Sequence, residues 1–267
     1  MYKSTPKIIV VLFFLFLSSS FAQKEVKNFI GGNFGISDFH LKDIHASPLI
    51  YSGTNSTPSF QYFYNEEISR HYFEATYSFN PLTTLSDNLN TSTDIIRFRY
   101  SYVHSSTDFD FLEMKFSLFG GGSVGTFLSL SNYYQDQQII LPRIKIMKSW
   151  YWSHSLDISL QLIHELQPRQ FFSLQLFIPL LSNVSRPQYS PSADFNYPEL
   201  DWKLKMFGKT KFIIDNFSVN TILTFQSPLY LNFNYQLSYE FFYSTYSEPK
   251  EVSMFMNSFR AGLFFCF

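Results

Sequence analysis

The sequence predicts an all-β protein, a transmembrane antiparallel meander β-barrel of 12 strands, with 10 strands as the alternative. Three observations predict this fold. The chain of 267 residues is 20% aromatic but only 15% charged, whereas an ordinary soluble domain is about 25% charged. Long segments alternate apolar and polar residues, which is the period of a β-strand. After residue 22, no apolar run approaches the ~18 residues of a membrane-spanning helix.

The alternation is clearest over residues 229–243. All eight odd positions are Leu, Phe or Tyr, whereas five of the seven even positions are polar. Successive side chains of a strand point to opposite faces, so this segment has one apolar and one polar face. A helix would spread the same residues around its circumference. Because the polar positions carry mainly amides and hydroxyls, we favour a membrane barrel over a soluble sandwich.

The other strands follow from the same pattern in chain order. Apolar residues occupy every second position within Ile96–Tyr102, Leu112–Leu118, Leu156–Leu162, Phe172–Ile178 and, with one interruption, Phe217–Phe225. Several predicted strands exceed the ~5–6 residues typical of soluble strands and reach the ~9–11 residues that cross a bilayer at a tilt. The predicted strands are 28–37, 58–67, 69–80, 94–104, 111–127, 138–149, 152–165, 171–181, 199–207, 212–226, 229–243 and 254–267.

Residues 1–22 have the three parts of a cleaved export signal. Lys3 and Lys7 form its positive end, residues 8–17 form an apolar run, and Ser20-Phe21-Ala22 places small residues at a cleavage site. The apolar run is too short to span a bilayer as a helix. The expected mature protein is residues 23–267, a single barrel domain.

The last predicted strand carries apolar residues at alternate positions and ends in Phe. These residues are Phe259, Ala261, Leu263, Phe265 and Phe267. The pattern resembles the C-terminal signature of bacterial outer-membrane β-barrel proteins. The resemblance implies a place in the bacterial outer membrane, contact with outer-membrane lipid, and Phe259, Leu263, Phe265 and Phe267 as the signal read by the barrel-assembly machinery. It specifies no activity, because such barrels range from passive pores to lipid-modifying enzymes.

The order of the predicted strands sets which end each connection faces. With both termini periplasmic, connections after even-numbered strands face the periplasm, where turns are short. Short turns are predicted near Ile68 and at 105–110 and 227–228, and outer loops at 38–57, 81–93, 128–137 and 244–253. The Pro-rich segment 182–198 conflicts with this order, since it would fall on the periplasmic side and Pro is excluded from central strands. A miscounted strand near Trp150 or Trp202 would explain the conflict, and ten strands are the alternative.

Ten charged residues occupy polar positions of the predicted strands and are expected to face the lumen. They are Glu74, Arg97, Arg99, Glu113, Lys115, Asp157, Lys203, Lys205, Glu240 and Arg260. An unpaired charge in a low-dielectric interior is costly, so pairing across the lumen is expected. Two interpretations stay open: a salt-bridged plug that braces the barrel, and a narrow polar pore that favours small anionic solutes.

No catalytic residues are predicted. Outer-membrane phospholipases carry His and Ser with one residue between them, followed by Asn-Gly; His104 and Ser106 share the spacing, but Thr107-Asp108 follows. His154 has the parity of the apolar face and could meet lipid headgroups, but the sequence identifies no Ser partner. The six histidines lack metal-ligand spacing, so we expect no metal and no cofactor.

The sequence therefore predicts a non-enzymatic outer-membrane barrel that serves as a narrow, porin-like channel or in a structural or interaction role. A lipid-acting outer-membrane hydrolase or acyltransferase is the first alternative, and a soluble secreted β protein is the second. Nucleic acid is not an expected partner, because the formal net charge is −1. A single cysteine excludes a disulfide scaffold.

Overall fold

The computed structural model describes residues 28–66, 68–84, 89–135, 144–167, 169–187 and 208–267. These residues form twelve strands in one antiparallel sheet. The strands are β1 (Asn28–Asp43), β2 (Ser47–Ser56), β3 (Ser59–Asn65), β4 (Ser69–Thr83), β5 (Leu89–Phe111), β6 (Met114–Gln135), β7 (Ile144–Gln167), β8 (Gln170–Ser185), β9 (Lys209–Phe212), β10 (Asn216–Tyr230), β11 (Phe233–Tyr246) and β12 (Val252–Cys266). Among these residues, no helix has the length and hydropathy needed to cross a bilayer. The predicted signal at 1–22 lies outside them.

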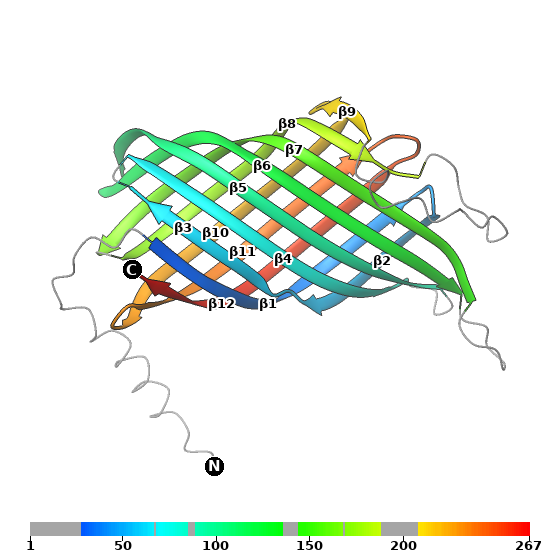
Figure 1. Ribbon diagram of the computed structural model, residues 1–267, viewed down its shortest axis with the longest axis horizontal. Coiled ribbons are helices and arrows are strands. Elements are labelled where there is room, and N and C mark those ends of the chain that lie inside the picture. The colour runs from blue at the N-terminus through cyan, green and yellow to red at the C-terminus, as the bar shows by residue number, and fades with distance from the viewer. Residues whose placement is uncertain (1–27, 67, 85–88, 136–143, 168, 188–207) are drawn as a thin grey trace, which may run out of the picture.

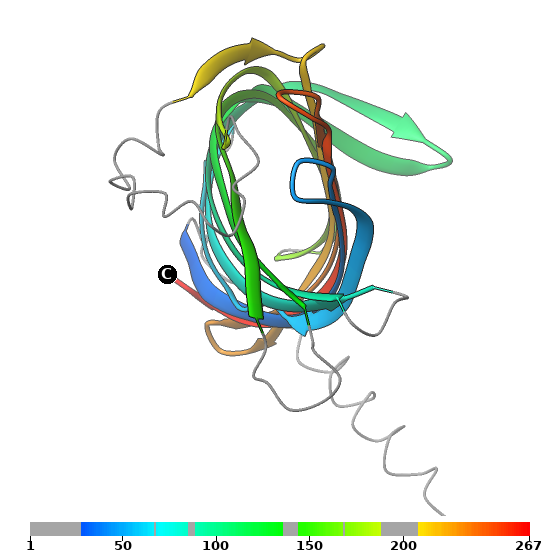
Figure 2. The same cartoon turned by 90° about the vertical axis from the view of Figure 1, so that its right-hand side faces the viewer.

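The sheet closes on itself as a barrel of strongly tilted strands (Figures 1 and 2). The first and last strands complete the ring: β1 pairs with β12 from Phe29 opposite Cys266 to Asp43 opposite Val252. The chain otherwise runs up and down between neighbouring strands. The predicted twelve-stranded antiparallel meander barrel is therefore confirmed.

Two positions in the ring are each shared by two consecutive strands. β2 and β3 both lie between β1 and β4, with β2 opposite residues 36–43 of β1 and β3 opposite residues 28–33. In the same way, β9 and β10 follow one another along β8, opposite residues 181–184 and 171–177 respectively. The twelve strands of the described chain thus occupy ten positions around the circumference.

Several segments differ from their sequence prediction. The predicted strands 138–149 and 152–165 belong to one strand, β7, where the structure describes them. The cause is that the aromatic residues at 150–152 favour an extended backbone and continue the pairing with β6. Residues 38–57, predicted as a loop, extend β1 and form β2. The predicted strand 199–207 lies outside the described residues.

The two ends of the barrel differ in their connections. At the terminal end, where β1 begins and β12 ends, the connections are short, at 66–68, 112–113, 168–169 and 231–232. The turns predicted at 105–110 and 227–228 are wrong, because β5 and β10 continue through them. The opposite end, here called the loop end, receives the connection from β8 to β9. Because β7 is one strand, β8 ends with Ser185 at the loop end rather than at the terminal end. The connection that follows β8 therefore begins at the loop end, which removes the conflict in the strand order.

At mid-height the barrel is apolar outside and polar inside. On β10 and β11, Leu223 and Tyr239 point outward and are 48% and 44% exposed, whereas Ser238 and Glu240 are buried. Strand β11 keeps this alternation along its whole length. The two faces that the sequence pattern predicts are therefore confirmed for these strands.

Side chains fill much of the lumen. Toward the loop end, apolar residues from many strands pack into one cluster that includes Phe39, Leu82 and Met254. A smaller cluster of Phe29, Phe264 and Cys266 lies at the terminal end. On β12, Arg260 lies between Phe264 and Met254, so a charged layer separates the two apolar clusters.

Candidate functional site

Four charged side chains from four strands meet in the middle of the lumen. Arg97 of β5 donates to both carboxylate oxygens of Glu240 on β11, with 2.8 Å between Nη2 and Oε2. Arg260 of β12 lies 3.0 Å from Oε2 of Glu240 and donates to Oε1 of Glu74 on β4 at 2.8 Å. These residues, here called the central network, form a chain of alternating charge from Glu74 through Arg260 and Glu240 to Arg97.

The alternation of the strands places these residues inside. On β5, Arg97 is buried, while the adjacent Phe98 points outward and is 45% exposed. Arg260 lies opposite Gly35 on β1. A Cβ at residue 35 would lie 2.5 Å from Cγ of Arg260 and 2.2 Å from the carbonyl oxygen of Phe259. Glycine at this position therefore leaves the room that the arginine stem occupies.

The central network is balanced in charge and withdrawn from water. Arg260 and Glu240 expose no surface, and Glu74 and Arg97 are buried. Removing an ion from water costs several kcal/mol, which only close pairing and further hydrogen bonds offset. Each of these two acids and two bases therefore needs its oppositely charged partners in order to stay charged and buried in the lumen.

Neutral amides extend the central network around the barrel. Nδ2 of Asn220 on β10 donates to Oε1 of Glu240. Nε2 of Gln61 on β3 donates to Oε1 of Glu74 at 2.9 Å, and Nε2 of Gln236 donates to Oε1 of Gln61 at 3.2 Å. The amides give the two carboxylates hydrogen bonds in addition to those from the two arginines, and such bonds stabilise a buried polar network.

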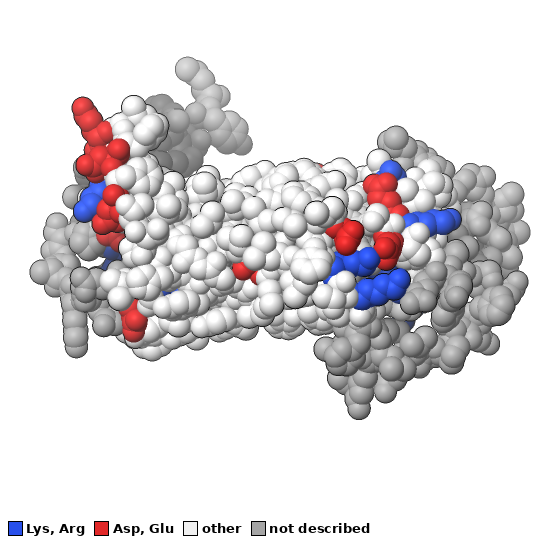
Figure 3. Space-filling view, turned by 90° about the horizontal axis from the view of Figure 1, so that it is seen from above, with Lys and Arg blue, Asp and Glu red and all other residues white. Residues whose placement is uncertain are grey.

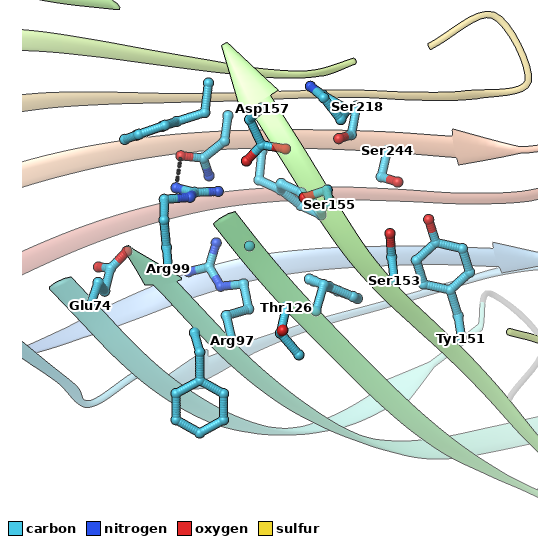
Figure 4. Close-up of a pocket in the computed structure, with 17 residues that line it drawn as sticks. Glu74, Arg97, Arg99, Thr126, Tyr151, Ser153, Ser155, Asp157, Ser218 and Ser244 are labelled. Atoms are coloured by element: carbon cyan, nitrogen blue, oxygen red, sulfur yellow. Dashed lines mark hydrogen bonds between the residues drawn. The ribbon is translucent and has the colours of Figure 1, made fainter. Parts of the chain in front are cut away.

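Arg99 and Asp157 also face the lumen, beside the central network. Nη1 of Arg99 donates to Oδ1 of Asn220 at 2.9 Å, and its guanidinium lies 4.0 Å from the centre of the Phe177 ring. Asp157 accepts a hydrogen bond of 3.1 Å from Oγ of Ser123. Both residues line a cavity of about 50 Å³ (Figure 4). A cavity of this size has room for a few water molecules.

A second buried ion pair lies near the loop end. Nη2 of Arg186 is 2.6 Å from Oδ1 of Asp43, and Oγ of Ser149 donates to Oδ2 of Asp43 at 2.8 Å. Nη1 of Arg186 donates to the carbonyl oxygen of Lys250 at 2.6 Å. The sequence pattern does not predict this pair, because Asp43 falls in a predicted loop and Arg186 falls in the Pro-rich segment. The signal that could have found the pair is spacing. Asp43 lies two residues after Leu41, so in a strand the two side chains point to the same face.

The remaining predicted lumen residues lie elsewhere. Glu113 and Lys115 are exposed at the tip of the β5–β6 hairpin, outside the lumen. The expectation is wrong for them, because β5 continues to Phe111 and carries the hairpin beyond the ring. Lys203 and Lys205 lie outside the described residues.

The predicted assembly signal lies on the outside of β12 and at its end. Phe259, Leu263, Phe265 and Phe267 are all exposed. The backbone of Phe267 exchanges two hydrogen bonds with Asn28, of 3.0 and 3.1 Å, and its ring stacks on Phe265. The terminal residue thus closes the pairing between the first and last strands.

The His–Ser pairs considered from the sequence do not form catalytic dyads among the described residues. Nδ1 of His104 bonds the carbonyl oxygen of Ser105 at 2.9 Å, and Ser106 lies at a bulge in the β5–β6 pairing. His154 points outward, with Nδ1 3.0 Å from Oγ1 of Thr126. In the described part of the chain, no three His, Cys, Asp or Glu side chains are grouped to hold a metal ion.

Comparisons with known proteins add no family. No family model matches the chain, and no curated protein matches it. Among solved structures, the translocator domain of autotransporter NalP from Neisseria meningitidis has 8% identity and a TM-score of 0.45, covering 98% of this chain and 94% of that one. Ail, the attachment invasion locus protein of Yersinia pestis, has 10% identity, a TM-score of 0.38 and coverages of 90% and 99%. An outer membrane channel from Pseudomonas putida F1 has 8% identity, a TM-score of 0.36 and coverages of 92% and 98%.

Proposed function

We propose that this protein is a non-enzymatic β-barrel of the bacterial outer membrane, with a lumen closed by the central network. In this proposal, residues 1–22 direct export, and the barrel serves a structural or interaction role rather than conducting solutes. The observation that carries the proposal is the chain of ion pairs from Glu74 to Arg97 across the lumen.

The distribution of charge supports the membrane location. In Figure 3 the side of the barrel is nearly free of Lys, Arg, Asp and Glu, which gather at its two ends. The uncharged side carries exposed residues such as Phe34, Phe79, Phe98, Leu156 and Leu263. In hydrocarbon every backbone polar group needs an internal partner, and a closed sheet provides one for each strand. An apolar exterior on a closed barrel is the arrangement that a bilayer stabilises.

The filling of the lumen supports a closed rather than a porin-like barrel. A conducting pore needs a continuous aqueous path, whereas the central network and its amides join β3, β4, β5, β10, β11 and β12 across the interior. The apolar cluster around Phe39 and Leu82 lies above this layer. Moving the charges apart to admit a solute would leave them unpaired in a low dielectric.

The two ends suit different partners. The terminal end, with its short connections and the exposed aromatic residues of β12, is where the barrel-assembly machinery would bind Phe259, Leu263, Phe265 and Phe267. The loop end holds the longer connections and an exposed group of ion pairs, in which Glu248 pairs with Lys211 at 2.8 Å and with Lys209 at 3.6 Å. An interaction with another molecule would use this end. Outer-membrane lipid would cover the uncharged side.

Planar-bilayer recording tests the closed lumen. Residues 23–267, refolded and shown by heat-dependent gel mobility to form a barrel, should give no discrete conductance steps. A matched variant that replaces Glu74, Arg97, Glu240 and Arg260 together with Ala removes the network without leaving an unpaired charge. The frequency of conductance steps in this variant, compared with the unmodified protein, measures how much the central network contributes to closure beyond the apolar cluster around Phe39 and Leu82. Discrete conductance steps in the unmodified protein would overturn the closed-lumen proposal and favour the anion-selective pore.

A further inference from the structure

The outside of the barrel carries a groove of about 410 Å³ over β4 to β9. Along one side of the groove, apolar side chains from five successive strands lie opposite one another in the sheet register. They are Phe73, Tyr100, Val124, Leu156 and Leu181. This apolar row gives an extended hydrocarbon chain a continuous surface to pack against.

The other side of the groove is formed by the neighbouring outward row. It begins with Phe98 and continues with the polar residues Thr126, His154, Asn183 and Thr210, each opposite the next. Thr210 is exposed on the short strand β9 near the loop end, so the polar row descends from the rim of the barrel toward its uncharged side. Polar groups facing hydrocarbon are costly unless they are hydrogen-bonded, and an ionisable residue there indicates a binding role.

Polar side chains that can donate hydrogen bonds line the groove. His154 and Arg99 are the titratable residues that line it, and the described lining includes no Asp or Glu. Nδ1 of His154 is held by Oγ1 of Thr126 at 3.0 Å, which fixes the ring at the groove. Arg99 lies opposite Gly125, which also lines the groove and has no side chain. A Cβ at residue 125 would lie 3.4 Å from Oδ2 of Asp157, so the charges of Arg99 and Asp157 oppose one another behind the wall. The polar row, not a net positive charge, therefore supplies the groups that would hold a lipid phosphate outside.

We propose that this groove binds one glycerophospholipid of the surrounding bilayer. One acyl chain lies along the apolar row, and the phosphate and ester oxygens accept hydrogen bonds from the polar row at His154. The inference rests on the proposed membrane location. It goes beyond that proposal because it assigns a specific lipid site to one face of the barrel.

Native mass spectrometry of residues 23–267, refolded in detergent and mixed with dioleoylphosphatidylglycerol, tests the site. The unmodified protein should retain one lipid molecule per barrel. Leu156→Trp fills the groove, and we expect it to weaken retention about tenfold, equivalent to roughly 1.4 kcal/mol. Leu160→Trp is the matched control, because Leu160 also points outward on β7 but lies outside the groove. It should retain lipid as the unmodified protein does.

His154→Leu tests the polar side separately. It replaces the imidazole with an apolar side chain of similar size and removes the hydrogen bonds to the lipid phosphate, so retention should fall while folding is kept. Equal retention by the Leu156→Trp and Leu160→Trp variants, or no retained lipid on a correctly folded barrel, would overturn the lipid site but not the membrane location. A mature chain that folds and stays soluble without detergent would overturn the membrane location itself.

Discussion

Arg260 of β12 and Glu240 of β11 form an ion pair of 3.0 Å in the centre of the lumen, and neither side chain exposes any surface. Glu240 also accepts two hydrogen bonds from Arg97 on β5. This one carboxylate therefore joins two arginines that approach it from different parts of the barrel wall. Its loss would leave two buried cations with a single remaining acid, Glu74.

Glu240→Leu should be strongly destabilising. Breaking a buried pair by removing one partner costs about 3–5 kcal/mol, since the other charge stays buried and uncompensated. We expect a loss of this size in the free energy of unfolding, measured by urea titration of the protein refolded into liposomes. Glu113→Gln, in the exposed turn between β5 and β6, is the control and should change stability by less than about 0.5 kcal/mol.

A second substitution tests whether the loss comes from the unpaired charge. Adding Arg97→Met to Glu240→Leu removes a base together with the acid, so the double variant should be more stable than Glu240→Leu alone. The single variant Arg97→Met completes the comparison. If the double variant lost as much stability as the two single variants together, Arg97 and Glu240 would not be energetically coupled, contrary to their hydrogen bonds.

Gly35→Ala should destabilise the barrel by about 1–3 kcal/mol, the usual cost of overpacking. The added Cβ would lie 2.2 Å from the Phe259 carbonyl oxygen and 2.5 Å from Cγ of Arg260. Gly32→Ala on the same strand is the matched control, because the nearest atom to its Cβ would be 3.5 Å away. The same urea titration compares the two variants, and a Gly32→Ala loss as large as that of Gly35→Ala would contradict the packing at Arg260.

Leu223→Arg should weaken the barrel in a bilayer by about 2–4 kcal/mol if Leu223 lies near the midplane. Leu223 points outward on β10, so the substitution places a charge in hydrocarbon. Leu223→Phe keeps the surface apolar and should be nearly neutral. Unfolding from liposomes measures both, and equal stability of the two variants would argue against lipid contact at this face.

Deletion of Phe267 should impair assembly in the outer membrane. The deletion removes the last residue of the proposed assembly signal and both backbone hydrogen bonds to Asn28. The measurement is the amount of heat-modifiable barrel in the outer-membrane fraction of cells that express the full chain. Tyr230→Ala, at an exposed aromatic residue of the same end of the barrel, should assemble at normal levels. Normal levels of the deletion variant would contradict the signal.

Much of the fold could be predicted from the sequence because side-chain direction in a strand has a period of two. Alternation alone assigns Leu223 and Tyr239 to one face and Glu240 to the other, and the structure shows these faces as outside and inside. It also places Arg97 and Arg260 on inward positions. Period and composition therefore determined the strand content and the orientation of these residues.

The sequence pattern failed where chain continuity or the ends of strands mattered. Nothing in the alternation distinguishes one long strand through 150–152 from two strands joined there, and β7 is one strand because it stays paired with β6 throughout. Glu113 is predicted to face the lumen for the same reason, because no local signal shows that β5 and β6 extend past the ring. Local residues do not report how far a neighbouring strand continues.

Contacts across the lumen depended on the closed barrel. Arg97 and Glu240 are 143 residues apart, and Arg260 and Glu74 are 186 residues apart. The alternation predicts that each of these side chains points inward. Their heights in the barrel depend on the tilt of the strands and on the register of every strand pair that lies between them. The groove beside His154 is likewise a product of register, because it needs side chains from several strands to align. Direction is a local property of the chain, whereas height and partner are properties of the closed sheet.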